Sequence, residues 1–454
     1  MTCYDQFIND KHVITALKEL AERHAVYRDH IKGVKAAQRD HAISYDQQLQ
    51  KMAQYRGQPL FFPFLGSGLG NGALVELADG SVKYDFINGI GVHWCHSDPD
   101  LIKVALQAAL ADTVMQGNLQ QHQGSCELYA LLTQITGMEH AFISTSGAMA
   151  WENAVKIAFH YKKHATRLLA FEKCFCGRTL AAAQVTDKAA NRVGLPLQLP
   201  VDYIPFYDPE DSLGSIERAV TALKTILQRY PHQHACMMFE LIQGEGGFNV
   251  GSRPFFVALM DVLKDHDIPI YVDEIQTFGR TPNLFAFQYF GLESYVDIVT
   301  IGKLAQVCAT MFRHRLNPNP GLLSQTFTSS TVAIESAKII IKKLKSPEYT
   351  GKKGKIVQMH DYFKKSFKQL LSLYPGDFKG PFGIGTMIAF EVFSGDPKQT
   401  MSFLRRLYHN GVLAFVAGST KKRIRFLLPI GGVTTEAIDE VMMIIEKTYK
   451  EEKT

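Results

Sequence analysis

Between about residue 140 and residue 310, short apolar runs alternate with longer amphipathic stretches. The runs have the length and apolar content of buried strands, and the stretches near 151–163, 214–229 and 254–265 have helical periodicity. This alternation predicts an α/β fold, with a mostly parallel sheet and helices on both of its faces. The expected strands are 141–144, 167–171, 235–240, a run that ends at Asp273 and a run that ends before Lys303.

Two of these runs end in groups that could serve one cofactor. The first ends in Asp273-Glu274-Ile275-Gln276, and the second ends at Gly302-Lys303. In an α/β sheet the carboxyl ends of the strands face the ligand crevice. A carboxylate and an amine in one crevice suit pyridoxal phosphate, which needs an amine for its aldehyde and an acid for its ring nitrogen. An aspartate at a strand end is more often a helix cap or a surface ion pair, and most lysines are solvated, so further motifs must support this interpretation.

Two further motifs follow expected strands. The small residues of Ser144-Thr145-Ser146-Gly147-Ala148 precede a helix expected to begin near Trp151, and free N–H groups at a helix start bind phosphate. The alternative is an ordinary strand–helix turn. In Lys173-Cys174-Phe175-Cys176-Gly177-Arg178-Thr179, Phe175 could stack on an aromatic ring, whereas Arg178 and Thr179 could be a structural ion pair and a cap. The two cysteines are too close in sequence for a usual zinc site, and no metal motif is found.

Carboxylates and arginines supply the remaining candidates. Glu240 and Glu245 flank glycines that permit a tight loop over a ligand. Near the C-terminus, Arg423 and Arg425 lie on one expected strand and face the same way, and a guanidinium suits a substrate carboxylate. The alternative for Arg425 is a surface charge on an edge strand.

Composition excludes several classes of protein. With 454 residues, 46% of them hydrophobic, the chain can bury a large core and form two or more domains. A net charge of +5 is small for this length and no basic stripe is interleaved with aromatics, so we expect no nucleic-acid partner. No apolar run is long enough to span a membrane, and we expect no membrane partner. Seven scattered cysteines and no secretory signal indicate reduced thiols in a cytoplasmic protein.

The remaining segments receive plainer interpretations. Residues 10–56 are expected to be helical and to pack on the domain or on a second subunit. The glycine-rich stretch 66–72 does not have phosphate-loop spacing and is interpreted as a turn. Lysines near 342–355 are expected to form a solvated surface turn.

Together and in this order, the motifs resemble those of class III aminotransferases, the pyridoxal-phosphate enzymes of the ornithine, acetylornithine, putrescine and 4-aminobutyrate group. The resemblance covers about residues 74–447, and its most specific part is Asp273-Glu274-Ile275-Gln276-Thr277-Phe278-Gly279-Arg280-Thr281, one residue shorter than usual. It implies fold type I, with a seven-stranded, mostly parallel sheet and a smaller α+β domain formed by the N- and C-terminal segments. The implied boundaries are 1–95 for an N-terminal arm and part of the small domain, 96–340 for the cofactor-binding domain and 341–454 for the rest of the small domain.

The resemblance also implies roles at the cofactor. Lys303 would hold pyridoxal 5'-phosphate and move the proton, and Asp273 would pair with the pyridinium nitrogen. Gln276 would reach the ring hydroxyl, and Phe175 would stack on the ring. Gly147 and Ala148 would give N–H groups to the phosphate.

Three further roles concern the substrates and a second subunit. Thr326 would reach the phosphate held by a neighbouring subunit, which implies a homodimer with shared active sites. Arg425 would bind the carboxylate of an amino or keto acid. Glu245 would neutralise Arg425 when the substrate has no carboxylate there.

The chain departs from the family pattern at several positions. Ala148, Met149 and Trp151 stand where the family usually has Ser or Thr, Glu, and Asn, and Cys176 replaces a usual His. The glycine run after the lysine is replaced by 304–308, and 328–330 replaces Gly-Gly-Asn. These departures predict an atypical phosphate cup and lysine loop.

The expected reaction is the transfer of an amino group from an amine or amino acid to a keto acid, 2-oxoglutarate by resemblance. The same fold and lysine also serve racemases, mutases and decarboxylases. The Glu245–Arg425 pair favours transamination, because it lets one pocket accept two different substrates. A catalytically altered relative that binds the cofactor or a partner is the third alternative, motivated by residues 148, 149 and 151.

Overall fold

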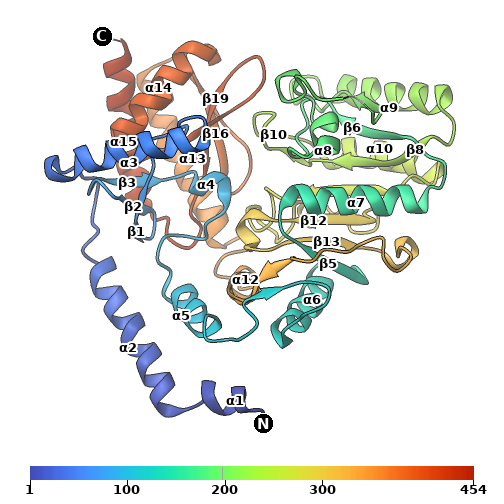
Figure 1. Ribbon diagram of the computed structural model, residues 1–454. Coiled ribbons are helices and arrows are strands. Elements are labelled where there is room, and N and C mark those ends of the chain that lie inside the picture. The colour runs from blue at the N-terminus through green and yellow to red at the C-terminus, as the bar shows by residue number, and fades with distance from the viewer. Residues whose placement is uncertain (197, 454) are drawn as a thin grey trace.

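The computed structural model describes residues 1–196 and 198–453, and a seven-stranded sheet forms the middle of its larger part, on the right in Figure 1. The strand order is β5-β13-β12-β11-β8-β6-β7, and every pair is parallel except those that β13 makes with β12 and β5. The expected α/β fold with a mostly parallel seven-stranded sheet is therefore confirmed. The strands are β5 (His140–Ser144), β6 (Arg167–Phe171), β7 (Val201–Ile204), β8 (His234–Phe239), β11 (Ile270–Glu274), β12 (Ile298–Ile301) and β13 (Cys308–Phe312).

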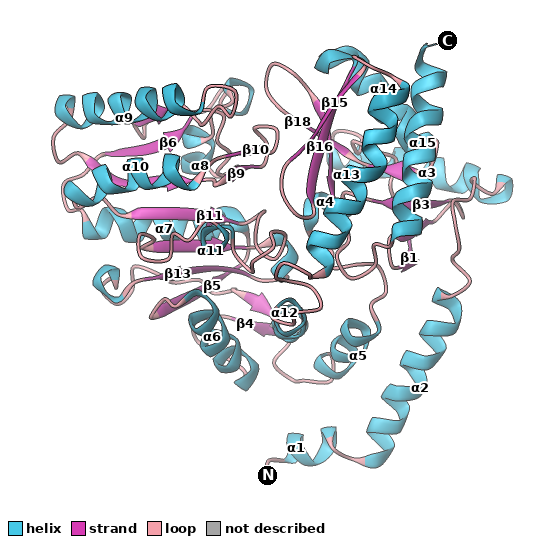
Figure 2. Cartoon of the chain, turned by 180° about the vertical axis from the view of Figure 1, so that it is seen from behind, coloured by secondary structure: helices cyan, strands magenta, loops and turns pink. Residues whose placement is uncertain are grey.

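Helices cover both faces of this sheet because successive strand residues point in opposite directions. On β6, Leu168 packs in the core beneath α7, and its neighbour Leu169 packs in the core on the opposite face. Figure 1 shows α7 in front of the sheet, and Figure 2, from behind, shows α10 in front of it. The helices around the sheet are α6 (Gln123–Thr136), α7 (Gly147–Tyr161), α8 (Leu180–Val185), α9 (Ser212–Arg229), α10 (Arg253–Asp265), α11 (Ala286–Tyr289) and α12 (Thr331–Leu344).

Segments from both ends of the chain build a smaller α+β part. Val82 and Phe86, near the N-terminal end, share one core with Phe363, Phe426 and Ile438. Two four-stranded sheets belong to it, in the orders β1-β2-β3-β17 and β15-β16-β19-β18. Their strands are β1 (Gly66–Asn71), β2 (Leu74–Leu77), β3 (Val82–Asp85), β15 (Phe378–Phe382), β16 (Met387–Val392), β17 (Val412–Leu413), β18 (Phe415–Ala417) and β19 (Arg423–Leu427), and its long helices are α13 (Lys355–Leu373), α14 (Pro397–His409) and α15 (Thr435–Lys453).

Of the N-terminal helices, the two nearest the chain start project from this body (Figures 1 and 2). The expected helical stretch 10–56 is divided into α2 (Lys11–Arg28) and α3 (Arg39–Arg56), and α1 (Cys3–Ile8) precedes them. No residue of α2 is buried, although this helix packs along α5 (Pro99–Ala108).

Two local expectations are wrong. The glycine-rich stretch is not a turn, because Gly66–Asn71 forms strand β1, antiparallel to β2. A Cβ on Gly70 would lie 2.6 Å from the Cβ of His96, so this glycine allows His96 to pack against the strand. The helix expected to begin near Trp151 begins at Gly147, because the Ser146 hydroxyl accepts a hydrogen bond from the N–H of Met149 and caps it there.

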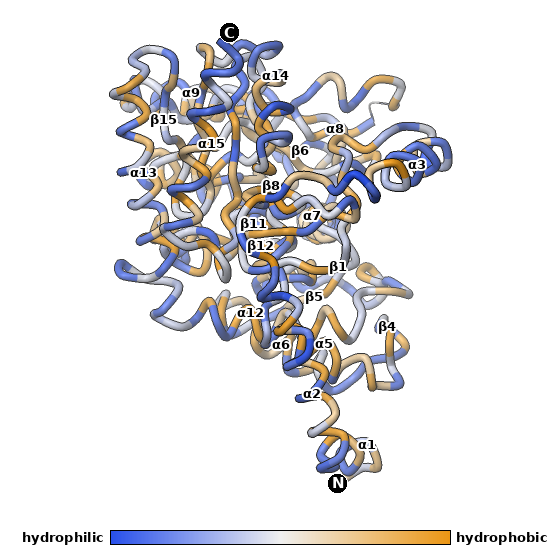
Figure 3. Tube along the Cα trace, turned by 90° about the vertical axis from the view of Figure 1, so that its left-hand side faces the viewer, coloured by the Kyte–Doolittle hydropathy of each residue, from blue (hydrophilic) through white to orange (hydrophobic). Residues whose placement is uncertain are grey.

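Hydropathy follows this architecture. The trace of the central strands, such as β8, is largely hydrophobic in Figure 3, whereas the outlying helix α3 carries much of the hydrophilic colour. Among the described residues, none of the helices has the length and apolar character needed to cross a bilayer.

Candidate active site

The carboxyl ends of β11 and β12 open into a cavity of about 230 Å³. This is the edge of an α/β sheet at which ligands bind. The cavity gathers residues from five separate segments of the chain, and most of the residues singled out from the sequence line it. Those residues are Gly147, Ala148, Phe175, Glu245, Asp273, Gln276 and Lys303.

Asp273 lies near the end of β11, beside Thr300 of β12. Its carboxylate accepts hydrogen bonds from the Ile275 N–H at 2.9 Å and from the Tyr271 hydroxyl at 3.3 Å. The Tyr271 hydroxyl also lies 2.9 Å from the Thr300 hydroxyl, so the carboxylate is fixed from two strands. Burial raises the pKa of Asp273 to about 6. A cation bound in the cavity would oppose this shift, because a nearby positive charge stabilises the ionised form of the Asp273 carboxyl.

Lys303 follows β12 at the same end of the sheet, in the single turn η2 (Lys303–Ala305). Its φ is +48°, a conformation that side-chain-bearing residues adopt rarely and mostly at functional sites. Burial, followed by the positive charge of Arg425, lowers the pKa of Lys303 to about 8. Much of the amine is thus neutral near pH 8, which is the form that attacks a carbonyl carbon.

Gln306 holds the turn that follows Lys303. Its side-chain Nε2 donates a hydrogen bond of 2.5 Å to the Val92 carbonyl, and its φ is +62°. In the part of the sequence expected to be a loop, Cys308 already begins β13. The departure from a glycine run thus builds a contact between the lysine turn and the segment 88–93.

Glu240 connects two walls of the cavity. One oxygen accepts the Phe175 N–H at 2.8 Å, and the other accepts the Gly244 N–H at 3.2 Å. Burial, followed by the negative charge of Asp273, raises the pKa of Glu240 to about 8. Glu240 therefore fixes the aromatic wall and the start of the loop that carries Glu245.

The N-terminus of α7 forms another part of the cavity wall. Gly147 and Ala148 line the cavity, and the first N–H groups of a helix have no acceptor within it. A Cβ on Gly147 would lie 3.0 Å from the Ile275 side chain, so the glycine keeps this end open. Met149 and Trp151 are not among the lining residues, and Trp151 is buried with its indole N–H 3.2 Å from the Met238 sulfur. Of the departures at 148, 149 and 151, only Ala148 faces the cavity.

Arg425 reaches the cavity through Glu245. Its guanidinium donates hydrogen bonds to the Glu245 carboxylate at 2.5 Å and to the Gly244 carbonyl at 3.3 Å. Arg425 is fully buried on β19, which lies between β16 and β18, so the alternative of a surface charge on an edge strand is wrong. Its neighbour Arg423 holds the same loop further along, with a 2.7 Å hydrogen bond to the Gly247 carbonyl.

The remaining two predicted residues differ in their surroundings. Gln276 lines the cavity, and its buried Oε1 has no hydrogen-bond partner within residues 1–196 and 198–453. Thr326 is exposed and does not line the cavity of its own chain. Its role toward a neighbouring subunit stays a prediction.

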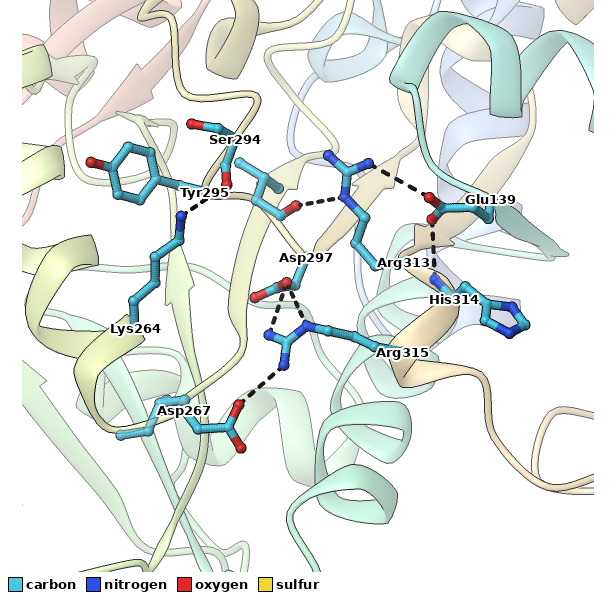
Figure 4. A pocket seen from close by; sticks show the side chains of 11 residues that line it. Glu139, Lys264, Asp267, Ser294, Tyr295, Asp297, Arg313, His314 and Arg315 are labelled. Atoms are coloured by element: carbon cyan, nitrogen blue, oxygen red, sulfur yellow. Dashed lines mark hydrogen bonds and ion pairs between the residues drawn. The ribbon is translucent and has the colours of Figure 1, made fainter.

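A larger depression of about 670 Å³ lies at the opposite end of the strands (Figure 4). Its charged groups are engaged with one another, as the dashed lines in the figure show. Arg315 lies 2.9 Å from Asp297 and 3.1 Å from Asp267, and Lys264 donates to the Ser294 carbonyl at 3.0 Å. We interpret the charged residues of this depression as a structural ion-pair network that stabilises this end of the sheet.

Sequence reasoning left several cavity residues without a role. Glu240 and Cys176 lie in the sequence motifs that contain Glu245 and Phe175, but neither residue was given a role in the site. Ile275 and Thr277 also line the cavity, within the Asp273 motif itself. Residues that follow Asp273 directly in the sequence border the same crevice. Their position could therefore have predicted that they line the cavity. Gln306 had no such signal.

The chain was compared with known proteins. The sequence model of the family "Aminotransferase class-III" matches residues 64–449. The chain is similar to an acetylornithine aminotransferase of Methanocaldococcus jannaschii, with 27% identity over 85% of this chain and 93% of the relative. It is also similar to an acetylornithine aminotransferase of Lactococcus lactis subsp. lactis, with 31% identity over 77% of this chain and 88% of the relative.

Solved structures agree at the level of the fold. A lysine aminotransferase from M. tuberculosis superposes with a TM-score of 0.78 at 22% identity, covering 89% of this chain and 99% of that one. An ornithine aminotransferase from Toxoplasma gondii ME49 gives a TM-score of 0.78 at 23% identity, over 94% and 99% of the two chains. The chain belongs to the class III aminotransferase family. It is an aminotransferase with the type I fold of pyridoxal-phosphate enzymes, as the sequence motifs predicted.

Proposed function

We propose that this aminotransferase uses pyridoxal 5'-phosphate to move an amino group from an amine or amino acid to a keto acid, 2-oxoglutarate. The observation that carries the proposal is that the Lys303 amine and the Asp273 carboxylate line one cavity at the ends of adjacent parallel strands. An amine and a carboxylic acid are the two groups that this cofactor needs from a protein.

The chemistry of the donor set fits the cofactor. A cavity of about 150 Å³ accepts a benzene ring, so the 230 Å³ here leaves room for ring substituents. Phe175 and Ile275 offer apolar walls, and the unpartnered Gln276 Oε1 can accept a hydrogen bond from a ring hydroxyl. Gly147 and Ala148 offer the helix N-terminus to a phosphate.

In this proposal the protein positions groups and moves one proton. When bound, the cofactor supplies an electron sink that makes the substrate C–H acidic. Asp273, ionised beside a cationic ring nitrogen, keeps that nitrogen protonated. Lys303, with a pKa lowered to about 8, can accept the proton from the substrate carbon and return it at another carbon.

Glu245 and Arg425 give the site two states for its two substrates. With the pair closed, the charge of Arg425 is neutralised and an uncharged group can lie against it. With Glu245 turned away, Arg425 can bind the carboxylate of the keto acid. Named relatives act on acetylornithine, lysine and ornithine, which supports an amine or amino acid as the donor to the keto acid.

We further propose a homodimer in which Thr326 of each subunit reaches the phosphate site of the other. An exposed apolar surface beside Thr326 supports this, because large apolar side chains grouped on a surface mark interaction sites. It includes Leu110, Val114, Met115, Leu119 and Phe327, of which Leu119 is 102% exposed.

All seven cysteines are free, which supports a cytoplasmic location.

The decisive test is keto-acid-dependent loss of amine by the purified protein loaded with pyridoxal phosphate. Ornithine, acetylornithine, lysine, 4-aminobutyrate and putrescine would each be supplied with 2-oxoglutarate, and glutamate would be measured. We expect the parent enzyme to form glutamate and the Lys303→Ala variant to form none. Conversion of the amine without glutamate formation would overturn the proposal in favour of a racemase, mutase or decarboxylase, and an unchanged rate in Lys303→Ala would overturn the role given to Lys303.

A further inference from the structure

A second cavity, here called the aromatic pocket, lies beside the active site and has a volume of about 310 Å³. Aromatic and branched aliphatic side chains form most of its wall. Phe61 lies edge-on to Phe62 and tilted against Phe415, each at a ring-centroid distance of 4.8 Å. Its apolar lining includes Phe61, Phe62, Phe64, Ile90, Leu413 and Phe415.

Strand pairing joins the aromatic pocket to the substrate end of the active site. Phe415 on β18 is the direct partner of Arg425 on β19, so the two side chains share one face of the sheet. The Arg425 guanidinium carbon lies 5.3 Å from the centre of the Phe415 ring. Arg425 in turn donates to Glu245, which lines the cofactor cavity. The aromatic pocket therefore adjoins the part of the active site that contains Arg425 and Glu245.

The loop around Ile90 joins the pocket to the lysine as well. The turn α4 (Asn88–Gly91) packs against both η2, which carries Lys303, and β19, which carries Arg425. Ile90 has φ +65°, a conformation that is an outlier for a β-branched residue. Because such conformations persist mainly at functional sites, the strain supports a role for this wall in binding.

The Asp85 carboxylate lines this pocket, but it is already hydrogen-bonded and offers no free charge to a ligand. Asp85 is buried, and one of its oxygens accepts the N–H groups of Ile87 and Asn88 at 3.2 and 2.7 Å. Its other oxygen lies 2.9 Å from His96 Nε2. A second ammonium, such as the one on ornithine or lysine, would lose water here and meet no unpaired carboxylate among the lining residues. An uncharged apolar group would gain from leaving water.

We propose that the amino donor ends in an uncharged apolar group about the size of a phenyl ring, and that this group occupies the aromatic pocket. The proposal rests on the proposed aminotransferase function and specifies its substrate class. It sets this chain apart from an enzyme whose donor carries a second charged amine.

Three amines share a four-carbon chain, differ only at its far end and test this directly: 4-phenylbutylamine, butylamine and putrescine. With the loaded enzyme and 2-oxoglutarate, kcat/KM for 4-phenylbutylamine should exceed that for butylamine by at least about tenfold, and putrescine should be the poorest. Phe415→Ala should lower the phenyl preference several-fold. Tyr55→Ala, at an aromatic residue that is 84% exposed on α3, should leave it unchanged.

Binding without turnover separates this proposal from the proposed function. Calorimetric titration of the enzyme with 4-phenylbutyrate and butyrate should show tighter binding of the phenyl compound, weakened in Phe415→Ala at an unchanged circular dichroism spectrum. If no amine is transaminated but this phenyl preference is found, the proposed function fails and the pocket assignment stands. If putrescine is transaminated as well as 4-phenylbutylamine, or the two acids bind equally, the pocket assignment is overturned.

Discussion

Arg425 donates a hydrogen bond of 2.5 Å to Glu245, while its own buried Nε finds no acceptor in the described part of the chain. A buried donor without a partner is costly, and a substrate carboxylate would satisfy it. Glu245 thus neutralises the arginine without using all of its hydrogen-bonding capacity. We propose that the pair opens when a substrate carboxylate offers Arg425 a better acceptor.

Glu245→Gln should separate the two half-reactions. Without the carboxylate, Arg425 stays positively charged, so the KM for 2-oxoglutarate should fall or stay unchanged. Amines that have no carboxylate should lose about tenfold in kcat/KM, because their uncharged end would face an unneutralised guanidinium. Steady-state kinetics with each substrate varied in turn checks this. Equal losses for both substrates would contradict the role given to Glu245.

Asp273→Asn should lower kcat by about 10²- to 10⁴-fold, because an amide cannot stabilise a protonated ring nitrogen. The loss should appear in kcat more than in KM, since the carboxylate acts on the reacting cofactor and not on the substrate. Asp265→Asn, at an exposed aspartate that ends α10, is the matched control and should retain full activity. An Asp273→Asn enzyme within twofold of the parent would contradict the assignment.

The lowered pKa of Lys303, about 8, predicts how loading depends on pH. Only the neutral amine reacts with an aldehyde, so the rate at which apo-protein binds pyridoxal phosphate should rise about tenfold between pH 7 and pH 9 and then level off. Arg425→Gln removes a positive charge that opposes protonation, which raises the pKa and should move this rise to higher pH. Stopped-flow absorbance measures it. A rate still climbing steeply above pH 10 would indicate an ordinary lysine.

Trp151 supports the fold and lies outside the cofactor cavity. It is buried to 1% exposure beneath the sheet, with its indole N–H on the Met238 sulfur. Trp151→Ala should therefore lower the free energy of unfolding by about 3–5 kcal/mol. Met443→Ala, at a side chain that is 62% exposed, should change it by less than about 0.5 kcal/mol. Urea denaturation of both variants decides this, and equal midpoints would contradict it.

Strand ends explain why much of the site could be predicted from the sequence. Asp273 and Lys303 each follow an apolar run, and parallel strands bring such positions to one edge whatever their separation along the chain. The Gly147 turn follows another strand and joins them for the same reason. Physical pattern and family resemblance therefore agree on these residues.

Other features had no local signal. β13 begins at Cys308, so close to Lys303 that the run was interpreted as a loop, and its antiparallel course depends on β5 and β12. The aromatic pocket brings together Phe61, Ile90 and Phe415, which belong to no common motif and meet only because the chain ends fold together. Glycines at 66–72 suggested a turn, whereas Gly66–Asn71 forms strand β1, in which Gly70 leaves room for His96.

The central claim is that one amine, that of Lys303, holds the cofactor. Purified protein would be incubated with pyridoxal phosphate, reduced with borohydride and digested, and the pyridoxyl-labelled peptide would be mapped by mass spectrometry. The account predicts a single stoichiometric label on Lys303, absent from Lys303→Ala. A stoichiometric label on another lysine, or none on Lys303, would contradict it.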